Sequence, residues 1–193
     1  MIFGLVILLV IIFYLVSFFN SLKTTQVHIT ASIQEIGNQL KRQASLIPNL
    51  IESAKSYLKQ EKGIFETLTS ARKGIESAIQ NQSGKNIEEA QQLISKALSS
   101  IKVIVESNPE IKSAGIISNL MDELRDTSDK IMYSRRTLID LTADFNTKIS
   151  TIPGIWIAPL MGFQPQKGLE TPISGDFTKV SESDTQTPKV DLN

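Results

Sequence analysis

The sequence predicts an all-α protein: an N-terminal transmembrane helix, an antiparallel up-and-down bundle of about four long helices, and a disordered C-terminal tail. Three observations support this. The chain begins with a charge-free apolar segment, apolar residues then recur every three or four positions, and the C-terminal end is rich in proline, serine and threonine. The expected divisions are an anchor at 1–22, a bundle at 23–163 and a tail at 164–193.

The anchor is the segment IFGLVILLVIIFYLVSFF at 2–19. A helix of this length rises about 27 Å, close to the ~30 Å hydrocarbon core of a bilayer. A cleaved signal peptide is the alternative, but it requires a positive region before the apolar run and a small-residue cleavage site after it. The sequence has neither. The residues expected in the hydrocarbon are Ile2, Phe3, Leu5, Val6, Ile7, Leu8, Leu9, Val10, Ile11, Ile12, Phe13, Leu15, Val16, Phe18 and Phe19.

Charge gives an expected orientation and excludes one class of partner. The first lysine, Lys23, follows the apolar segment, so the positive-inside rule places the bulk of the chain in the cytoplasm and the N-terminus outside. The expected location is the cell (inner or plasma) membrane, with a single pass. Lysine and arginine total 20 and aspartate and glutamate total 20, so the chain lacks the basic excess typical of nucleic-acid binding.

The first bundle helix contains a proline. Its apolar or small residues occur in steps of four or three from Ile29 to Leu58, and the phase is kept through Pro48. A break would reset this phase, so we expect one continuous helix that extends the membrane helix. Because proline removes the hydrogen bond to the carbonyl of Ala44, the helix is expected to bend at Pro48.

Three further helices follow from the same periodicity. The short links between them favour antiparallel neighbours with coiled-coil-like seams. Asn86 is the predicted N-cap of the second of these, while Pro153 and Gly154 end the last. The apolar stripes cover residues 64–79, 87–104 and 117–145, and the last includes the hydroxyl residues Thr127 and Ser134 at expected core positions.

Several segments together resemble one known family. LKRQASLIPNLIESAK at 40–55 is similar to the L-x-R-R-x-D-L-I-P-N-L-V-like helix of the LemA family. The resemblance continues in order to about residue 165, and it implies a membrane-anchored helical bundle with an external N-terminus and no known reaction. The other similar segments are TSARKG at 69–74, NPEIKS at 108–113, the long segment at 120–154 and APLMGF at 158–163.

The sequence departs from the family pattern at a few positions. Gln43 and Ser45 replace an arginine and an aspartate, and Ser128 replaces a glutamate. Leu138–Ile139 replaces a tyrosine–asparagine pair. Any role that requires an acid at position 45 or 128 is therefore not expected here.

The residues that carry most enzyme chemistry are scarce. There is no cysteine and only one histidine, so thiolate nucleophiles, zinc–thiolate sites and histidine-based metal sites are not expected. The Glu-x-x-His motif of di-iron bundles and a glycine-rich phosphate loop are also missing. We expect a protein that is not an enzyme and holds no cofactor or metal.

Polar residues beside the apolar stripes form the candidate site. In one interpretation they are a hydrogen-bonded network that sets helix register, in which Arg72 or Arg135 pairs with Glu123 or Asp140. In the other they form a contact surface for a partner or a small anionic ligand. These residues are Asn49, Arg72, Glu123, Thr127, Arg135 and Asn146.

The segment TIPGIWIAPLMGF at 151–163 is apolar, is broken by proline and glycine, and holds the only tryptophan, Trp156. It is expected either to fold across the end of the bundle or to contact the membrane interface or a partner.

The expected function is a scaffold or adaptor that binds other membrane-associated proteins or a second copy of itself, with no nucleic acid and no identified small-molecule substrate. The alternative is a ligand-sensing or accessory subunit of a membrane-associated enzyme complex, whose site forms only with a partner. A coiled coil of the membrane-fusion type fits less well, because the stripes are short and interrupted.

Overall fold

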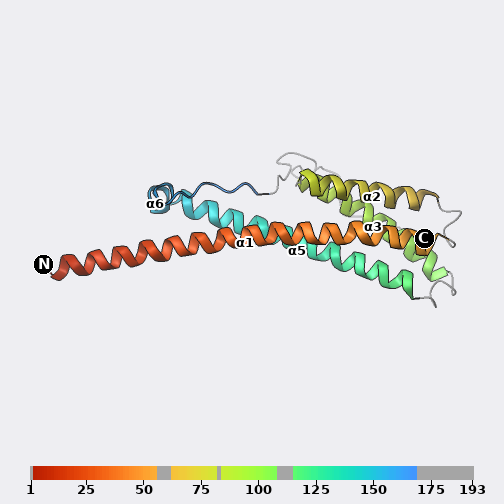
Figure 1. The fold of residues 1–193 in the computed structure, drawn as a ribbon, viewed down its shortest axis with the longest axis horizontal. Coiled ribbons are helices and arrows are strands. Elements are labelled where there is room, and N and C mark those ends of the chain that lie inside the picture. Colours follow the sequence, from red (N-terminus) through yellow and green to blue (C-terminus); the bar gives the residue numbers. More distant parts are fainter. Residues whose placement is uncertain (1, 56–61, 82–83, 108–114, 169–193) are drawn as a thin grey trace, which may run out of the picture.

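The computed structural model describes residues 2–55, 62–81, 84–107 and 115–168, and every regular element in these ranges is a helix (Figure 1). The all-α prediction is therefore confirmed for the described residues. The elements are α1 (Ile2–Ala54), α2 (Lys62–Asn81), α3 (Gly84–Ser107), α5 (Ile116–Ser150) and the short α6 (Gly154–Leu160).

The four long helices form the predicted antiparallel up-and-down bundle. α1 packs against both α5 and α2, and α2 packs against α3, whereas the contact between α3 and α5 is small. α1 and α5 extend beyond α2 and α3 toward the N-terminal end, and α1 continues alone past the end of α5 (Figure 1). The molecule thus narrows from four helices to two and then to one.

α1 is one continuous helix of 53 residues with Pro48 inside it, as the periodicity predicted. At 1.5 Å per residue it is about 80 Å long. The bend expected at Pro48 stays a prediction. The buried residues of α1 are Leu22, Thr25, Ile29, Ile36, Leu40, Gln43, Leu46, Ile47, Leu50 and Ala54.

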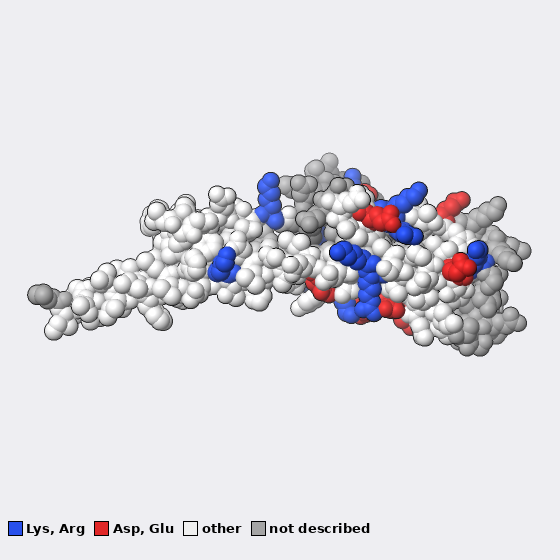
Figure 2. All heavy atoms as spheres, viewed as in Figure 1, with Lys and Arg blue, Asp and Glu red and all other residues white. Residues whose placement is uncertain are grey.

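The N-terminal part of α1 exposes large apolar side chains in all directions. Residues 2–13 are all exposed, and this part of the molecule is a rod without charged side chains (Figure 2). α1 is long and apolar enough to cross a membrane, a property that N-terminal signal sequences share.

The bundle core contains the stripes expected from the sequence, including two hydroxyl residues. Thr127 and Ser134 are buried on α5 as predicted, and the Thr127 hydroxyl donates to the carbonyl oxygen of Leu124 at 2.8 Å. The N-cap prediction for α3 is wrong. The helix begins at Gly84, so Asn86 lies in its first turn, and its Nδ2 donates to the hydroxyl of Ser77 on α2 at 3.1 Å.

The first five residues of the expected tail, 164–168, are described in the structure. Residues 164–168 return along α5, where Asn146 holds the backbone of Gln166. Asn146 Nδ2 donates to the Gln166 carbonyl at 3.0 Å, and the Gln166 amide donates to Asn146 Oδ1 at 2.9 Å. The composition of this segment predicted that the entropy cost of ordering it would keep it disordered. The two hydrogen bonds to Asn146 offset that cost for residues 164–168. The rest of the predicted tail lies outside the described residues.

Asn146→Ala is expected to release residues 164–168 from α5. The variant loses both hydrogen bonds to Gln166, so trypsin should cleave after Lys167 several-fold faster while the bundle unfolds at nearly the same temperature. Timed digestion followed by mass spectrometry measures this. Asn119→Ala, at an exposed position of the same helix, is the control. Equal cleavage rates for the two variants would show that Asn146 does not hold this segment.

Candidate functional site: a groove between α3 and α5

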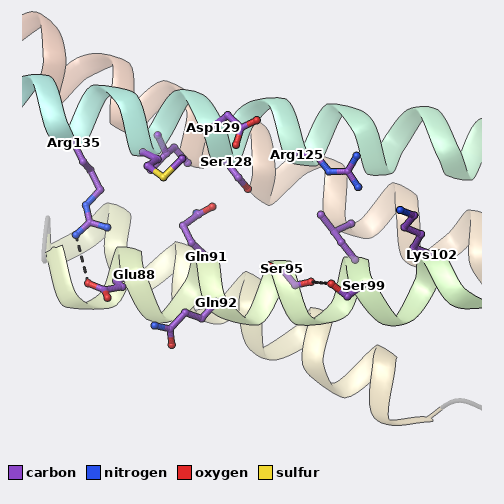
Figure 3. Close-up of a pocket in the computed structure, with 13 residues that line it drawn as sticks. Glu88, Gln91, Gln92, Ser95, Ser99, Lys102, Arg125, Ser128, Asp129 and Arg135 are labelled. Carbon is purple, nitrogen blue, oxygen red and sulfur yellow. Dashed lines mark hydrogen bonds and ion pairs between the residues drawn. The ribbon is translucent and has the colours of Figure 1, made fainter. Parts of the chain in front are cut away.

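The small contact between α3 and α5 leaves a groove on this side of the bundle (Figure 3). Its main part has a volume of about 580 Å³. A second hollow of about 240 Å³ shares Lys102 and Arg125 with it and continues along the same two helices. From Arg135 to Ser118 on α5 the groove is about 25 Å long.

The base of the groove is partly apolar and partly amide. Leu98 and Ile131 are buried there. Below them lies Gln43 of α1, which is fully buried. Gln43 Nε2 donates to Gln91 Oε1 at 3.1 Å and to Ser128 Oγ at 2.9 Å, and Gln91 Nε2 donates back to Gln43 Oε1 at 2.8 Å. These hydrogen bonds join α1, α3 and α5 and satisfy an amide that would otherwise destabilise the core.

One end of the groove is crossed by an ion pair. Arg135 of α5 and Glu88 of α3 point toward each other, with Nη2 3.7 Å from Oε2 (Figure 3). The Arg135 side chain is only 19% exposed, and among the described residues its buried Nε–H has no hydrogen-bond partner. The Arg135 guanidinium is therefore held largely out of solvent at this end of the groove.

The other end is basic. Lys102 of α3 and Arg125 of α5 lie on opposite sides of the groove (Figure 3). Among the described residues, each forms an exposed ion pair on its own helix, at 3.8 Å to Glu106 and 3.5 Å to Asp122. Exposed pairs of this kind contribute little stability, so both cations can accept an acidic group from another molecule.

Comparison with known families identifies the chain. The model of the LemA family matches residues 32–191. The chain belongs to the LemA family. This match covers the described bundle from residue 32 onward and confirms the resemblance seen in the sequence motifs. No curated protein matches the chain.

The LemA bundle does not gather the six predicted polar residues into one network. Arg72 pairs with Glu76 on its own helix at 3.1 Å, and Arg135 pairs with Glu88. The predicted pairing of these arginines with Glu123 or Asp140 is wrong, because the periodicity that located them did not specify which helices would face each other. Of the six, only Arg135 lines the groove.

The remaining predicted residues occupy separate places in the LemA fold. Glu123 accepts hydrogen bonds from Arg42 of α1, with Nε 3.0 Å from Oε1. This hydrogen bond, and the charge of Glu123, raise the pKa of Arg42 above its ordinary value. Thr127 is buried, Asn146 holds Gln166 and Asn49 is exposed. These residues connect helices or segments and do not form a common site.

Sequence reasoning missed Gln43 as a core residue. It lies one position before Ala44 in the expected stripe, yet it is the more buried of the two, because α1 faces α2 and α5 together and its buried face is correspondingly wide. The sequence did contain one signal that could have identified Gln43. Gln43 and Ser128 are both positions where the sequence departs from the family motif, and they hydrogen-bond to each other.

The groove is suited to binding. Among the described residues, no three histidine, aspartate or glutamate side chains lie close enough to hold a metal ion. The charged side chains of the groove are on its rim, where solvent and ion pairs surround them. A partly apolar base between charged rims is the arrangement expected for recognition of an amphipathic segment.

Proposed function

We propose that this LemA-family chain is a single-pass membrane protein whose helical bundle acts as a scaffold or adaptor, without catalysis of its own. The groove between α3 and α5 binds an α-helical segment of another membrane-associated protein. The observation that carries the proposal is the groove itself: two long helices of the bundle barely touch, and a partly apolar base with charged rims lies between them.

The continuity of α1 supports the anchor. α1 passes from the apolar segment into the bundle without a break, and Leu22 is fully buried soon after the segment ends. Cleavage after this segment would cut inside a helix that is packed against α5. A membrane span that continues into a bundle helix also gives the groove a fixed direction relative to the membrane.

The dimensions and charges of the groove support a helical occupant. A helix of about 17 residues matches its 25 Å length. Apolar side chains of such a helix would meet Leu98 and Ile131, as in other helix-in-groove complexes. An acidic side chain placed between Lys102 and Arg125 would gain two ionic partners at that end.

Photocrosslinking in cells tests the proposal with two neighbouring positions. Met132 and Tyr133 are similarly exposed, at 66% and 74%, but only Met132 lines the groove. A photoreactive residue at position 132 of the full-length protein is expected to capture a discrete membrane-associated protein. The same residue at position 133 should not. Combining the probe at 132 with Lys102→Glu and Arg125→Glu should reduce that capture at least several-fold.

The alternative outcomes are informative. Equal capture at both positions, or capture that survives the two charge reversals, would contradict docking in the groove. Crosslinks only to a second copy would replace the adaptor with a self-associating bundle. A third outcome is that no protein is captured, and that a small molecule copurifies with the wild type but not with the Lys102→Glu, Arg125→Glu variant. The chain would then be a ligand-sensing or accessory subunit.

A further inference from the structure

The short helix α6 is packed in the opposite sense to an ordinary surface helix. Its small residues Gly154 and Ala158, one turn apart, face the bundle and are buried. Three of its four large apolar residues face outward: Ile155 and Trp156 are exposed, and Leu160 is 89% exposed, whereas Ile157 is half-buried. In water, burial of the large side chains would be worth roughly 25 cal/mol per Å², so the observed orientation is unfavourable there. If the surroundings of α6 are apolar, such as lipid, the same orientation becomes favourable because the large side chains are then out of water.

The packing of α6 holds it at one height on α1. A Cβ atom on Gly154 would lie 3.1 Å from the ring of Phe18, so there is no room for a side chain between them. Just after α6, the ring of Phe163 lies between those of Phe19 and Phe145, with centroid distances of 5.4 and 6.1 Å. Phe18 and Phe19 are the last residues of the apolar segment 2–19, so α6 lies beside the end of that segment.

The charges around α6 are arranged as at a membrane surface. No charged residue occurs between Lys148 and Lys167, the interval that contains α6. Lys23 follows Phe19 by one helical turn, and no acid precedes Glu35. Charged side chains are visible on the bundle but not on the N-terminal rod (Figure 2). Tryptophan at the end of an apolar span, with lysines just beyond it, is typical of the lipid–water interface.

We infer that α6 is an interfacial membrane helix. Ile155, Trp156 and Leu160 enter the boundary between headgroups and acyl chains of the membrane that α1 crosses, and Lys23 faces the lipid phosphates. This inference rests on the proposed membrane span of α1. A single span leaves the tilt of the bundle relative to the membrane free, whereas a second contact through α6 sets both its height and its tilt. The surface presented by the groove is then fixed relative to the bilayer.

Trp156 is the only tryptophan in the chain, so its fluorescence reports on α6 alone. The full-length protein is reconstituted into vesicles of phosphatidylcholine and phosphatidylglycerol that carry bromine atoms either near the headgroup or near the chain end. The emission of Trp156 is expected to shift to shorter wavelength, to resist iodide, and to lose most intensity with the shallow bromines. The matched control combines Trp156→Phe with Tyr133→Trp, which moves the fluorophore to an exposed bundle position. It should be quenched by iodide and not by bromolipids.

Resistance of the vesicle-bound protein to alkaline carbonate separates failure of this inference from failure of the proposed span. Protein that stays in the vesicles but shows iodide-accessible Trp156, or Trp156 quenched by neither reagent because a second copy covers it, overturns the interfacial role and leaves the span intact. Protein that carbonate extracts overturns the span, and the interfacial role with it.

Discussion

Replacing Gln43 with arginine is expected to lower the free energy of unfolding by about 3 kcal/mol, a large share of the stability of a protein of this size. Gln43 is fully buried, and its two partners, Gln91 and Ser128, are neutral. The guanidinium would therefore lose its hydration without gaining a carboxylate. Chemical denaturation of the full-length protein, followed by circular dichroism, measures the effect.

A second substitution tests whether charge is the cause. Ser128 lies 2.9 Å from Gln43, so Ser128→Glu places a carboxylate next to the new arginine. The double variant is expected to recover most of the lost stability, with a coupling energy of at least about 2 kcal/mol. Gln92→Arg, at an exposed position of α3, is the control and should have almost no effect. A Gln43→Arg variant as stable as the wild type would mean that position 43 is not sealed from water.

Gly154→Ala is expected to displace α6 and to cost about 2 kcal/mol. The added methyl carbon would lie 1.9 Å from the carbonyl oxygen of Lys148, far inside van der Waals contact. Because this atom belongs to the backbone of α5, no side-chain rotation relieves the clash. The emission spectrum of Trp156 and the denaturation midpoint in detergent measure the change.

Gly37→Ala is the matched control for this glycine. Gly37 lies inside α1, and a Cβ atom there meets nothing within 4 Å. Alanine should stabilise the protein by about 1 kcal/mol through helix propensity, which is the opposite sign. If Gly154→Ala instead gave an unchanged Trp156 spectrum and the same midpoint, the close packing of α6 on α5 would be refuted.

The two proposed contacts lie at different places along the bundle. α6 is at the end of the apolar segment, whereas the groove runs along α3 and α5 where four helices are present (Figure 1). Both depend on helix α5, whose C-terminal end leads into α6. A partner helix in the groove would therefore lie parallel to the bundle axis, at a height and direction that α6 and α1 set together.

The sequence alone determined the architecture, because a helix with one buried face produces a local pattern of apolar residues along the sequence. Apolar residues spaced by three and four positions identify a buried face whatever that face meets. This pattern was sufficient to predict the all-α bundle, the continuous helix through Pro48, and the burial of Thr127 and Ser134. The sequence also predicted that residues 2–19 form a helix long and apolar enough to cross a membrane, because composition and length alone determine this property.

Only the tertiary structure decided which residues meet across helices. The pairs Arg42–Glu123 and Gln43–Ser128 depend on the relative register of α1 and α5, which periodicity does not encode. The outward orientation of Trp156 was undecidable for a related reason. In a short apolar segment every residue is suited to burial, and close approach to the Lys148 carbonyl and Phe18 determines that Gly154 faces inward. Local patterns specify the faces of helices, whereas long-range packing selects their partners and so creates the groove.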